Sequence, residues 1–178
     1  LSRQCSRALR TRPAGFNLVV AGNVITELHG EDLQNLLREI EACMAPGAAL
    51  VIIDPGTKKS SRQLLAVRDA VLQATSLHLC APCLQSGPCP LGAKDNEWCH
   101  EKMFWKPPGM VKAVDAVLPF TKERGIKYSY LTFTRQSLSR LSLYTDCAPE
   151  TVWRVVSYLI RNRGEERLHV CNGCRRVL

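Results

Sequence analysis

Phe16 to Ile25 has the sequence FNLVVAGNVI, a short apolar run that is rich in valine. A run of this length and composition predicts a strand that is buried on both faces. Ala48 to Ile53, with the sequence AALVII, predicts a second strand of the same kind. Such strands are typical of a parallel sheet covered by helices, so the pair favours the doubly wound α/β class of fold.

A helix is expected between these two strands. Glu31 and Asp32 suit the positive N-terminus of a helix, and Pro46-Gly47 is expected to end it. Cys43 lies on the apolar face of this helix and is interpreted as a small core residue. That face repeats at helical spacing through Leu33, Leu36, Leu37, Ile40 and Met44.

Further elements are expected along the rest of the chain. A second helix follows the turn at Asp54-Pro55-Gly56, with Ser60 or Ser61 as its cap. The later elements are a short helix at Val111–Leu118, a strand at Ile126–Thr134, an apolar β-rich stretch at Trp153–Ile160 and a last strand at Leu168–Cys171.

Length and composition exclude several classes of protein. The chain has 178 residues, 46% of them hydrophobic, which is ordinary for one globular domain. Its longest apolar run is far shorter than the ~20 residues of a membrane span, so no membrane partner is expected. The first 13 residues are rich in arginine and lack an apolar core, unlike a secretory signal. Because the chain also lacks an initiator Met, we expect a fragment or a processed product.

The net charge of +8 favours an anionic partner, and RNA is the first candidate. A solvated basic surface is the plainer alternative. The basic residues form two terminal clusters and one central scatter, namely Arg3, Arg7, Arg10 and Arg12, then Arg154, Arg161, Arg163, Arg167, Arg175 and Arg176, and Lys102, Lys106 and Lys112.

His78 to Pro108 carries four cysteines and five prolines without a sustained period. An irregular segment of this length needs an explanation, and a bound metal would replace the hydrophobic core that it lacks. The nine cysteines of a chain without an export signal favour metal or redox chemistry over disulfides. Free thiols in a loop are the plain alternative.

The cysteine spacings allow two kinds of metal site. The loose spacing from Cys83 through Cys89 to Cys99 fits a loop wrapped around a larger group such as a cubane cluster. Spacing alone favours zinc, because zinc sites are commoner. A four-thiolate zinc site could form from two C-x₂-C pairs, Cys80/Cys83 and Cys171/Cys174.

Several catalytic and nucleotide-binding motifs are absent from the sequence. It contains no G-x-G-x-x-G, no G-x-x-x-x-G-K-[ST], no H-E-x-x-H and no G-x-S-x-G. In a doubly wound fold the nucleotide-binding strands would therefore lie upstream of Leu1. A thiol redox enzyme built on Cys80 and Cys83 is a distant alternative, because this pair does not open a helix after a strand.

Four groups of motifs resemble one known family. Ala21 to Leu28, AGNVITEL, resembles the fourth strand and turn of class I S-adenosylmethionine-dependent methyltransferases. Ala48 to Thr57, followed by Ser61-Arg62 and Val67-Arg68-Asp69, resembles the fifth strand and next helix of one branch. The most specific motifs are Ala81-Pro82-Cys83, Pro88-Cys89-Pro90-Leu91, Trp98-Cys99-His100 and Lys127-Tyr128-Ser129-Tyr130-Leu131.

Together these motifs resemble the methyltransferase-like family associated with the mitochondrial small ribosomal subunit and its bacterial relatives. The resemblance implies a Rossmann-like methyltransferase fold with an inserted cysteine site. Residues 1–76 would be the C-terminal part of the methyltransferase domain, and residues 77–110 a Cys-rich metal-binding insertion. Residues 111–178 would supply the remaining strands and a basic C-terminal segment.

The resemblance also implies a function and a metal centre. The protein would assist assembly of the small ribosomal subunit and contact ribosomal RNA, in the mitochondrial matrix of a eukaryote or the cytoplasm of a bacterium. It would carry a 4Fe-4S cluster, with zinc as the alternative. Carried over by position, the ligands are Cys83, Cys89, Cys99 and Cys171, with Cys174 as the alternative to Cys171. Cys80 would be spare.

Methyl transfer rests on fewer residues. Gly22 and Asn23 match the end of the fourth strand beside S-adenosylmethionine and are expected to bind that cofactor, although Asn23 is equally a plain turn residue. The glycine-rich half of the cofactor site is absent, so the chain alone should bind S-adenosylmethionine poorly. The aromatic residue that amine methyltransferases often place beside the reactive methyl is also absent, so no catalytic residue is assigned.

Three functions therefore stay open. The first is an assembly factor on a methyltransferase scaffold, and the second is an active RNA methyltransferase. The third is a zinc-stabilised binding module without methyltransferase activity.

Overall fold

A computed structural model describes residues 15–94, 96–118, 125–137, 146–157, 159–162 and 164–178. The N-terminal basic cluster at Arg3, Arg7, Arg10 and Arg12, and also Arg163, lie outside these described residues. No helix within the described ranges is long and apolar enough to cross a membrane.

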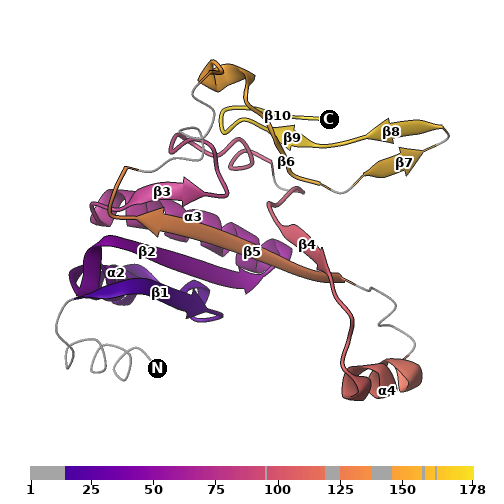
Figure 1. Ribbon diagram of the computed structural model, residues 1–178, viewed down its shortest axis with the longest axis horizontal. Coiled ribbons are helices and arrows are strands. Elements are labelled where there is room, and N and C mark those ends of the chain that lie inside the picture. Colours follow the sequence, from indigo (N-terminus) through magenta and orange to yellow (C-terminus); the bar gives the residue numbers. More distant parts are fainter. Residues whose placement is uncertain (1–14, 95, 119–124, 138–145, 158, 163) are drawn as a thin grey trace.

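The main sheet is mixed (Figure 1). Strands β1 (Phe16–Gly22) and β2 (Met44–Pro55) are parallel, as the sequence predicts. Strand β5 (Gly125–Thr134) runs antiparallel between β2 and β3 (His78–Ala81), and β4 (Glu101–Phe104) also pairs with β5. The α/β class is confirmed, but the parallel pairing stops at the second strand.

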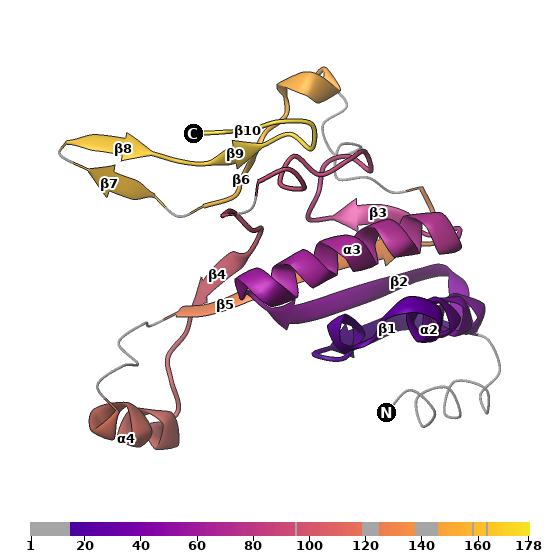
Figure 2. The ribbon, with the colours of Figure 1, turned by 180° about the vertical axis from the view of Figure 1, so that it is seen from behind.

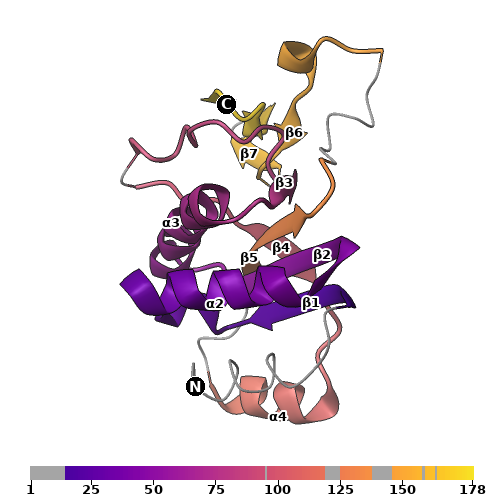
Figure 3. The same ribbon diagram turned by 90° about the vertical axis from the view of Figure 1, so that its left-hand side faces the viewer.

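Helices α2 (Gly30–Cys43) and α3 (Lys58–Ala74) cover one face of this sheet, as Figures 2 and 3 show. Their apolar residues pack on the buried side chains of β2 and β5. The opposite face is open in the described part of the chain, where Leu18 is 57% and Val20 59% exposed. The expectation that the first strand is buried on both faces is therefore wrong for these residues.

Two boundaries differ from the sequence prediction. Helix α2 ends at Cys43, and Pro46-Gly47 lies within β2, whose pairing with β1 is irregular there. Helix α3 is capped by Thr57, whose Oγ1 accepts a hydrogen bond from the Ser60 backbone N–H at 3.1 Å. Ser61 is buried and bonds elsewhere, so the expected Ser60 or Ser61 cap is also wrong.

The C-terminal part forms a separate small sheet and a hairpin. Strands β6 (Arg154–Val155), β9 (Val170–Cys171) and β10 (Arg176–Val177) pair antiparallel in the order β10-β9-β6. Strands β7 (Ile160–Asn162) and β8 (Glu165–Arg167) form a hairpin that projects beyond this sheet (Figure 1). Among the described residues of Trp153–Ile160, strands cover only Arg154–Val155 and Ile160, and the strand ending at Cys171 is not the last one.

Three short elements complete the described structure. The predicted helix near Val111–Leu118 is confirmed as α4 (Gly109–Val117), which lies apart from the main sheet (Figure 2). The other two are 3₁₀ helices. η1 (Ile25–Glu27) follows β1, and η3 (Pro149–Thr151) precedes β6.

Candidate metal centre

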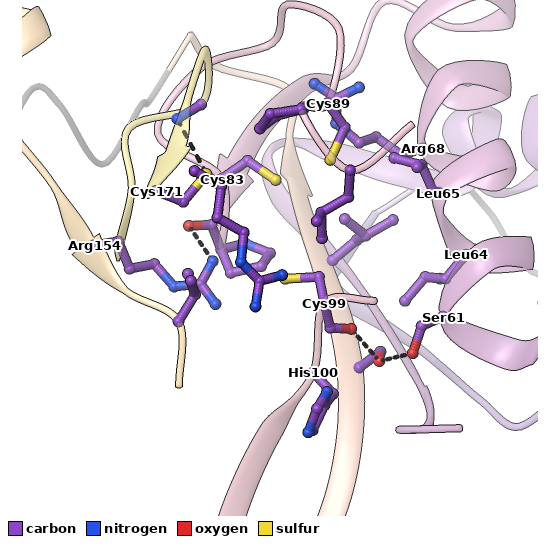
Figure 4. Close-up of a pocket in the computed structure, with 18 of the residues that line it drawn as sticks. Ser61, Leu64, Leu65, Arg68, Cys83, Cys89, Cys99, His100, Arg154 and Cys171 are labelled. Carbon is purple, nitrogen blue, oxygen red and sulfur yellow. Dashed lines mark hydrogen bonds between the residues drawn. The ribbon is translucent and has the colours of Figure 1, made fainter. Parts of the chain in front are cut away.

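A pocket lies where α3, β5, the segment between β3 and β4, and the C-terminal sheet meet (Figure 4). It contains about 830 Å³ of empty space, part of which is open to solvent. Segments from four regions of the sequence therefore share one cavity. Its wall includes all four cysteines of the ligand set that the resemblance implies, Cys83, Cys89, Cys99 and Cys171.

Side chains of α3 bind backbone carbonyls of the chain between β3 and β4, the Cys-rich segment. Arg62 donates from Nη1 to the Leu91 carbonyl at 2.8 Å and from Nη2 to the Glu97 carbonyl at 2.9 Å. Arg68 donates from Nη2 to the Gly87 carbonyl at 2.6 Å. These bonds give the segment a fixed path beside the helix although it contains little regular structure.

Cys99 is placed by a chain of hydroxyls. The Ser129 Oγ donates to the Cys99 carbonyl at 2.8 Å, and the Ser61 and Ser129 hydroxyls lie 2.6 Å apart (Figure 4). Next to Cys99, the Trp98 indole N–H donates to the Gly56 carbonyl at 3.0 Å. Helix α3, strand β5 and the end of β2 therefore all fix this part of the pocket.

Cys171 to Cys174 forms a tight knuckle. The Asn172 Oδ1 accepts from the backbone N–H groups of Cys174 at 3.0 Å and Arg175 at 2.8 Å. Gly173 has φ +93°, which an L side chain rarely adopts, and its N–H donates to Cys171 Sγ at 3.4 Å. N–H···S bonds of this kind are common around metal–sulfur centres.

The pocket wall carries both cysteine thiols and positively charged arginine side chains. The pKa of the Cys83 thiol is raised to about 11, mainly by burial and also by the neighbouring Cys99, while Arg68 acts in the opposite direction. Burial also raises the pKa of Cys89. Burial by itself lowers the pKa of Arg154, but Cys99 and Glu101 raise it above its ordinary value. Several thiolates can exist here together only if positive charge offsets their repulsion.

The other cysteines of the Cys-rich regions lie elsewhere. Cys80 is half-buried on β3, and Cys174 is exposed, with its Sγ 2.9 Å from Gln85 Oε1. Neither residue lines the pocket. Within the described ranges, no three His, Cys, Asp or Glu side chains form a group that could hold a metal ion. One cysteine of each C-x₂-C pair, Cys83 and Cys171, therefore lines the pocket.

The expected cofactor residues lie at the carboxyl end of β1. Gly22 is the last residue of that strand and pairs with Ile53. Asn23 follows in the left-handed region with φ +56°, and its N–H donates to the Ile53 carbonyl at 2.9 Å. Neither residue lines the cysteine pocket. The backbone conformation of Asn23 suits a turn residue.

Sequence reasoning missed the arginines of the pocket wall. Arg154 and Arg176 were grouped with surface charges, but their side chains are only 13% and 9% exposed. Arg68 is 2% exposed on the face of α3 that also carries Leu64. The spacing of Leu64 and Arg68, four residues apart in a helix, places both on one face and was the available signal.

These observations define an α/β protein with a one-sided mixed sheet and a thiol-lined pocket against its C-terminal strands. The family model for the mitochondrial small ribosomal subunit protein Rsm22 matches residues 2–177, so the chain belongs to the Rsm22 family, which is methyltransferase-like. The resemblance inferred from the sequence is thereby confirmed. A comparison with curated proteins found no match.

Proposed function

We propose that the chain is part of a methyltransferase-like assembly factor of the small ribosomal subunit, and that its pocket holds a 4Fe-4S cluster on Cys83, Cys89, Cys99 and Cys171. The observation that carries this proposal is the meeting of four thiols, 88 positions apart from first to last (171 − 83), in one cavity. Membership in the Rsm22 family supports the ribosomal role and the mitochondrial matrix as its location.

The geometry favours a cluster over a zinc ion. A four-thiolate zinc site needs all four sulfur atoms at about 2.3 Å from one point. A cubane cluster binds each thiolate to a different iron atom, so its ligands surround a larger volume. The four cysteines line one cavity from different chain segments, which suits a group held from several sides. When bound, the cluster would bridge the Cys-rich segment to β9.

Serine substitutions test the ligand set. Changing Cys83, Cys89, Cys99 or Cys171 to serine should abolish most cluster binding, because each removes one soft ligand. Cys80→Ser and Cys174→Ser are the matched controls and should retain the iron of the unmodified chain. The readouts are iron content and visible absorption after anaerobic reconstitution. Loss of iron in the Cys80 control, or its full retention in the Cys99 variant, would refute this assignment.

Ribosomal RNA is proposed as the partner on grounds of charge. The net charge of +8 supports it, but the arginines contribute unequally. Arg154 and Arg176 form the pocket wall. In the hairpin β7–β8, Arg161 pairs with Glu166 at 2.9 Å and Arg167 pairs with Glu165. The central scatter supplies better phosphate contacts, because Lys106 and Lys112 are exposed.

Salt dependence tests this RNA contact. The double variant Lys106→Ala with Lys112→Ala should weaken binding to small-subunit RNA and reduce the slope of log affinity against log salt by about two. Removing the hairpin pair with Arg161→Ala and Glu166→Ala leaves the net charge unchanged and should leave the slope nearly unchanged. An unchanged slope in the lysine variant would remove these residues from the interface.

We also propose that the main sheet belongs to a methyltransferase scaffold. A parallel β1–β2 pair joined by α2, with an antiparallel strand beyond β2, supports the C-terminal half of a Rossmann-like methyltransferase sheet. On this proposal residues 77–110 are its metal-binding insertion. Gly22 and Asn23 lie at the carboxyl end of the parallel pair, which is the edge where such sheets bind ligands. They would contact S-adenosylmethionine once the rest of the cofactor site is present.

A further inference from the structure

Arg68 is a buried cation beside the cysteines. Its side chain is 2% exposed and is among the largest fully buried side chains of the described protein. It lines the pocket together with Cys83 and Cys89, and it reaches the pocket from the helix side (Figure 4). A guanidinium keeps its proton even when buried, so this position carries a full positive charge.

The contacts of Arg68 compensate this charge only in part. Nη2 donates to the carbonyls of Gly87 at 2.6 Å and Gln85 at 3.4 Å, and Nη1 donates to Asp69 Oδ1 at 2.6 Å. The Asp69 side chain is 52% exposed, so water screens its charge. Nε is buried and has no hydrogen-bond partner among the described residues. Burying a charge without a buried partner is unfavourable, which argues for an anion in the pocket.

Arg154 lies on the opposite side of the same pocket, on β6 (Figure 4). Nη1 donates to the Pro82 carbonyl at 3.2 Å, and Nη2 forms an ion pair with Glu101. Pro82 directly precedes Cys83, and Glu101 lies two residues after Cys99. Arg154 therefore contacts the two chain segments that carry these cysteines, as Arg68 contacts the segment between Cys83 and Cys89.

We propose that Arg68 and Arg154 are positioning residues for the metal centre, which hold its ligand-bearing segments and offset its negative charge. This inference rests on the proposed metal centre. A core with two positive charges and four thiolates carries a net charge of two minus, which the guanidinium groups would offset, with Glu101 neutralising part of the charge of Arg154. Positive charge near a metal–sulfur centre favours its reduced form, because reduction adds negative charge.

Charge and anchoring can be separated by a matched control. Arg62 lies on the same helix and also donates to two carbonyls of the Cys-rich segment, but it does not line the pocket. Arg62→Gln therefore removes the same kind of anchoring together with a charge that lies outside the pocket wall. Arg68→Gln and Arg154→Gln remove anchoring and charge, and Arg68→Lys keeps the charge while losing the planar fork.

The experiment uses the full 178-residue chain, reconstituted anaerobically with ferrous iron and sulfide. Iron release to a chelator should be about tenfold faster in Arg68→Gln and Arg154→Gln than in the unmodified chain. Their midpoint potentials should shift to more negative values, whereas Arg62→Gln and Arg68→Lys should keep the original potential. Arg154→Gln serves as the informative variant if Arg68→Gln does not fold, because Arg154 is less buried.

The experiment distinguishes failure of this inference from failure of the proposed metal centre. Arginine variants with the release rate and potential of the unmodified chain would overturn this inference and leave the metal centre intact. Equal effects in Arg62→Gln and the pocket variants would also overturn it, since anchoring would then explain the result. An unmodified chain that takes up neither iron nor zinc would overturn the metal centre, and the inference with it.

Discussion

Gly56 lies where β2 passes into α3, and its position leaves no room for a side chain. A Cβ there would stand 2.8 Å from the Lys127 carbonyl carbon and 2.8 Å from the Tyr128 nitrogen, both backbone atoms of β5. The Gly56 N–H also donates to the Lys127 carbonyl at 3.0 Å, and its own carbonyl accepts from Trp98. This residue therefore links the sheet to the Cys-rich segment.

Gly56→Ala should lower the free energy of unfolding by about 1–3 kcal/mol, because the added methyl group must displace backbone atoms. Gly109→Ala is the matched control, since a Cβ at Gly109 meets nothing within 4 Å. The control should be neutral or slightly stabilising. Urea denaturation measures both variants, and equal stability of the two would contradict the close packing at Gly56.

Asp54 is a buried carboxyl at the end of β2. Its Oδ1 accepts from the Thr26 hydroxyl at 2.8 Å, and its Oδ2 has no hydrogen-bond partner in the described residues. Burial raises the pKa of Asp54, the Thr26 hydrogen bond lowers it, and nearby Glu27 raises it. The folded state therefore holds the proton more tightly than the unfolded state does.

The raised pKa of Asp54 makes the free energy of unfolding depend on pH in a definite direction. Its favourable contribution is fully present below the unfolded pKa of Asp54 and is lost as the pH rises through the folded pKa. Asp54→Asn cannot ionise and keeps an acceptor for Thr26, so its stability relative to the unmodified chain should increase between pH 4 and pH 7. Parallel denaturation curves across this range check the trend, and a relative stability that is flat or decreases would contradict it.

At the scale of elements, the apolar face of α2 stabilises the sheet. Leu37 is fully buried in the core, together with residues of β2 and β5. Leu37→Ala should lower the free energy of unfolding by about 3 kcal/mol, because the substitution leaves a cavity. Leu18→Ala on the open face of β1 should change it by no more than about 0.5 kcal/mol. Similar losses in the two variants would show that this face is covered.

Elements with a long, regular apolar pattern were predictable from the sequence. Helix α2 and strand β5 were located to within a few residues because their side-chain periods are sustained. Strands β3 and β4 were missed because four residues are too few to show a period. The hairpin β7–β8 was missed because charged residues dominate its strands, and pairing rather than burial holds it.

At the scale of the whole molecule, the candidate site is assembled from distant segments. The four cysteines could be predicted by resemblance, because soft ligands in a fixed order form a recognisable motif. The surrounding arginines could not, since a charged residue such as Arg154 is expected on the surface when its neighbours in space are unknown. Only the folded chain shows that Arg68 and Arg154 face the same cavity from two elements.

The chain also has two differently built regions. The main sheet and its helices bury a continuous apolar core. The C-terminal strands β6, β9 and β10 are two residues long each, and Val156 and Asn172 are among their few buried neighbours. A metal centre between the two regions would stabilise the second one, because metal–ligand bonds replace apolar contacts in a segment of this kind.

The metal centre is tested most directly by measuring iron, acid-labile sulfide and zinc per chain after anaerobic purification, together with the visible spectrum. We predict about four irons and four sulfides per chain and a broad absorption band at ~400 nm. One zinc per chain without colour would contradict the cluster and favour a tetrahedral thiolate site. A folded chain with neither metal would contradict the metal centre itself.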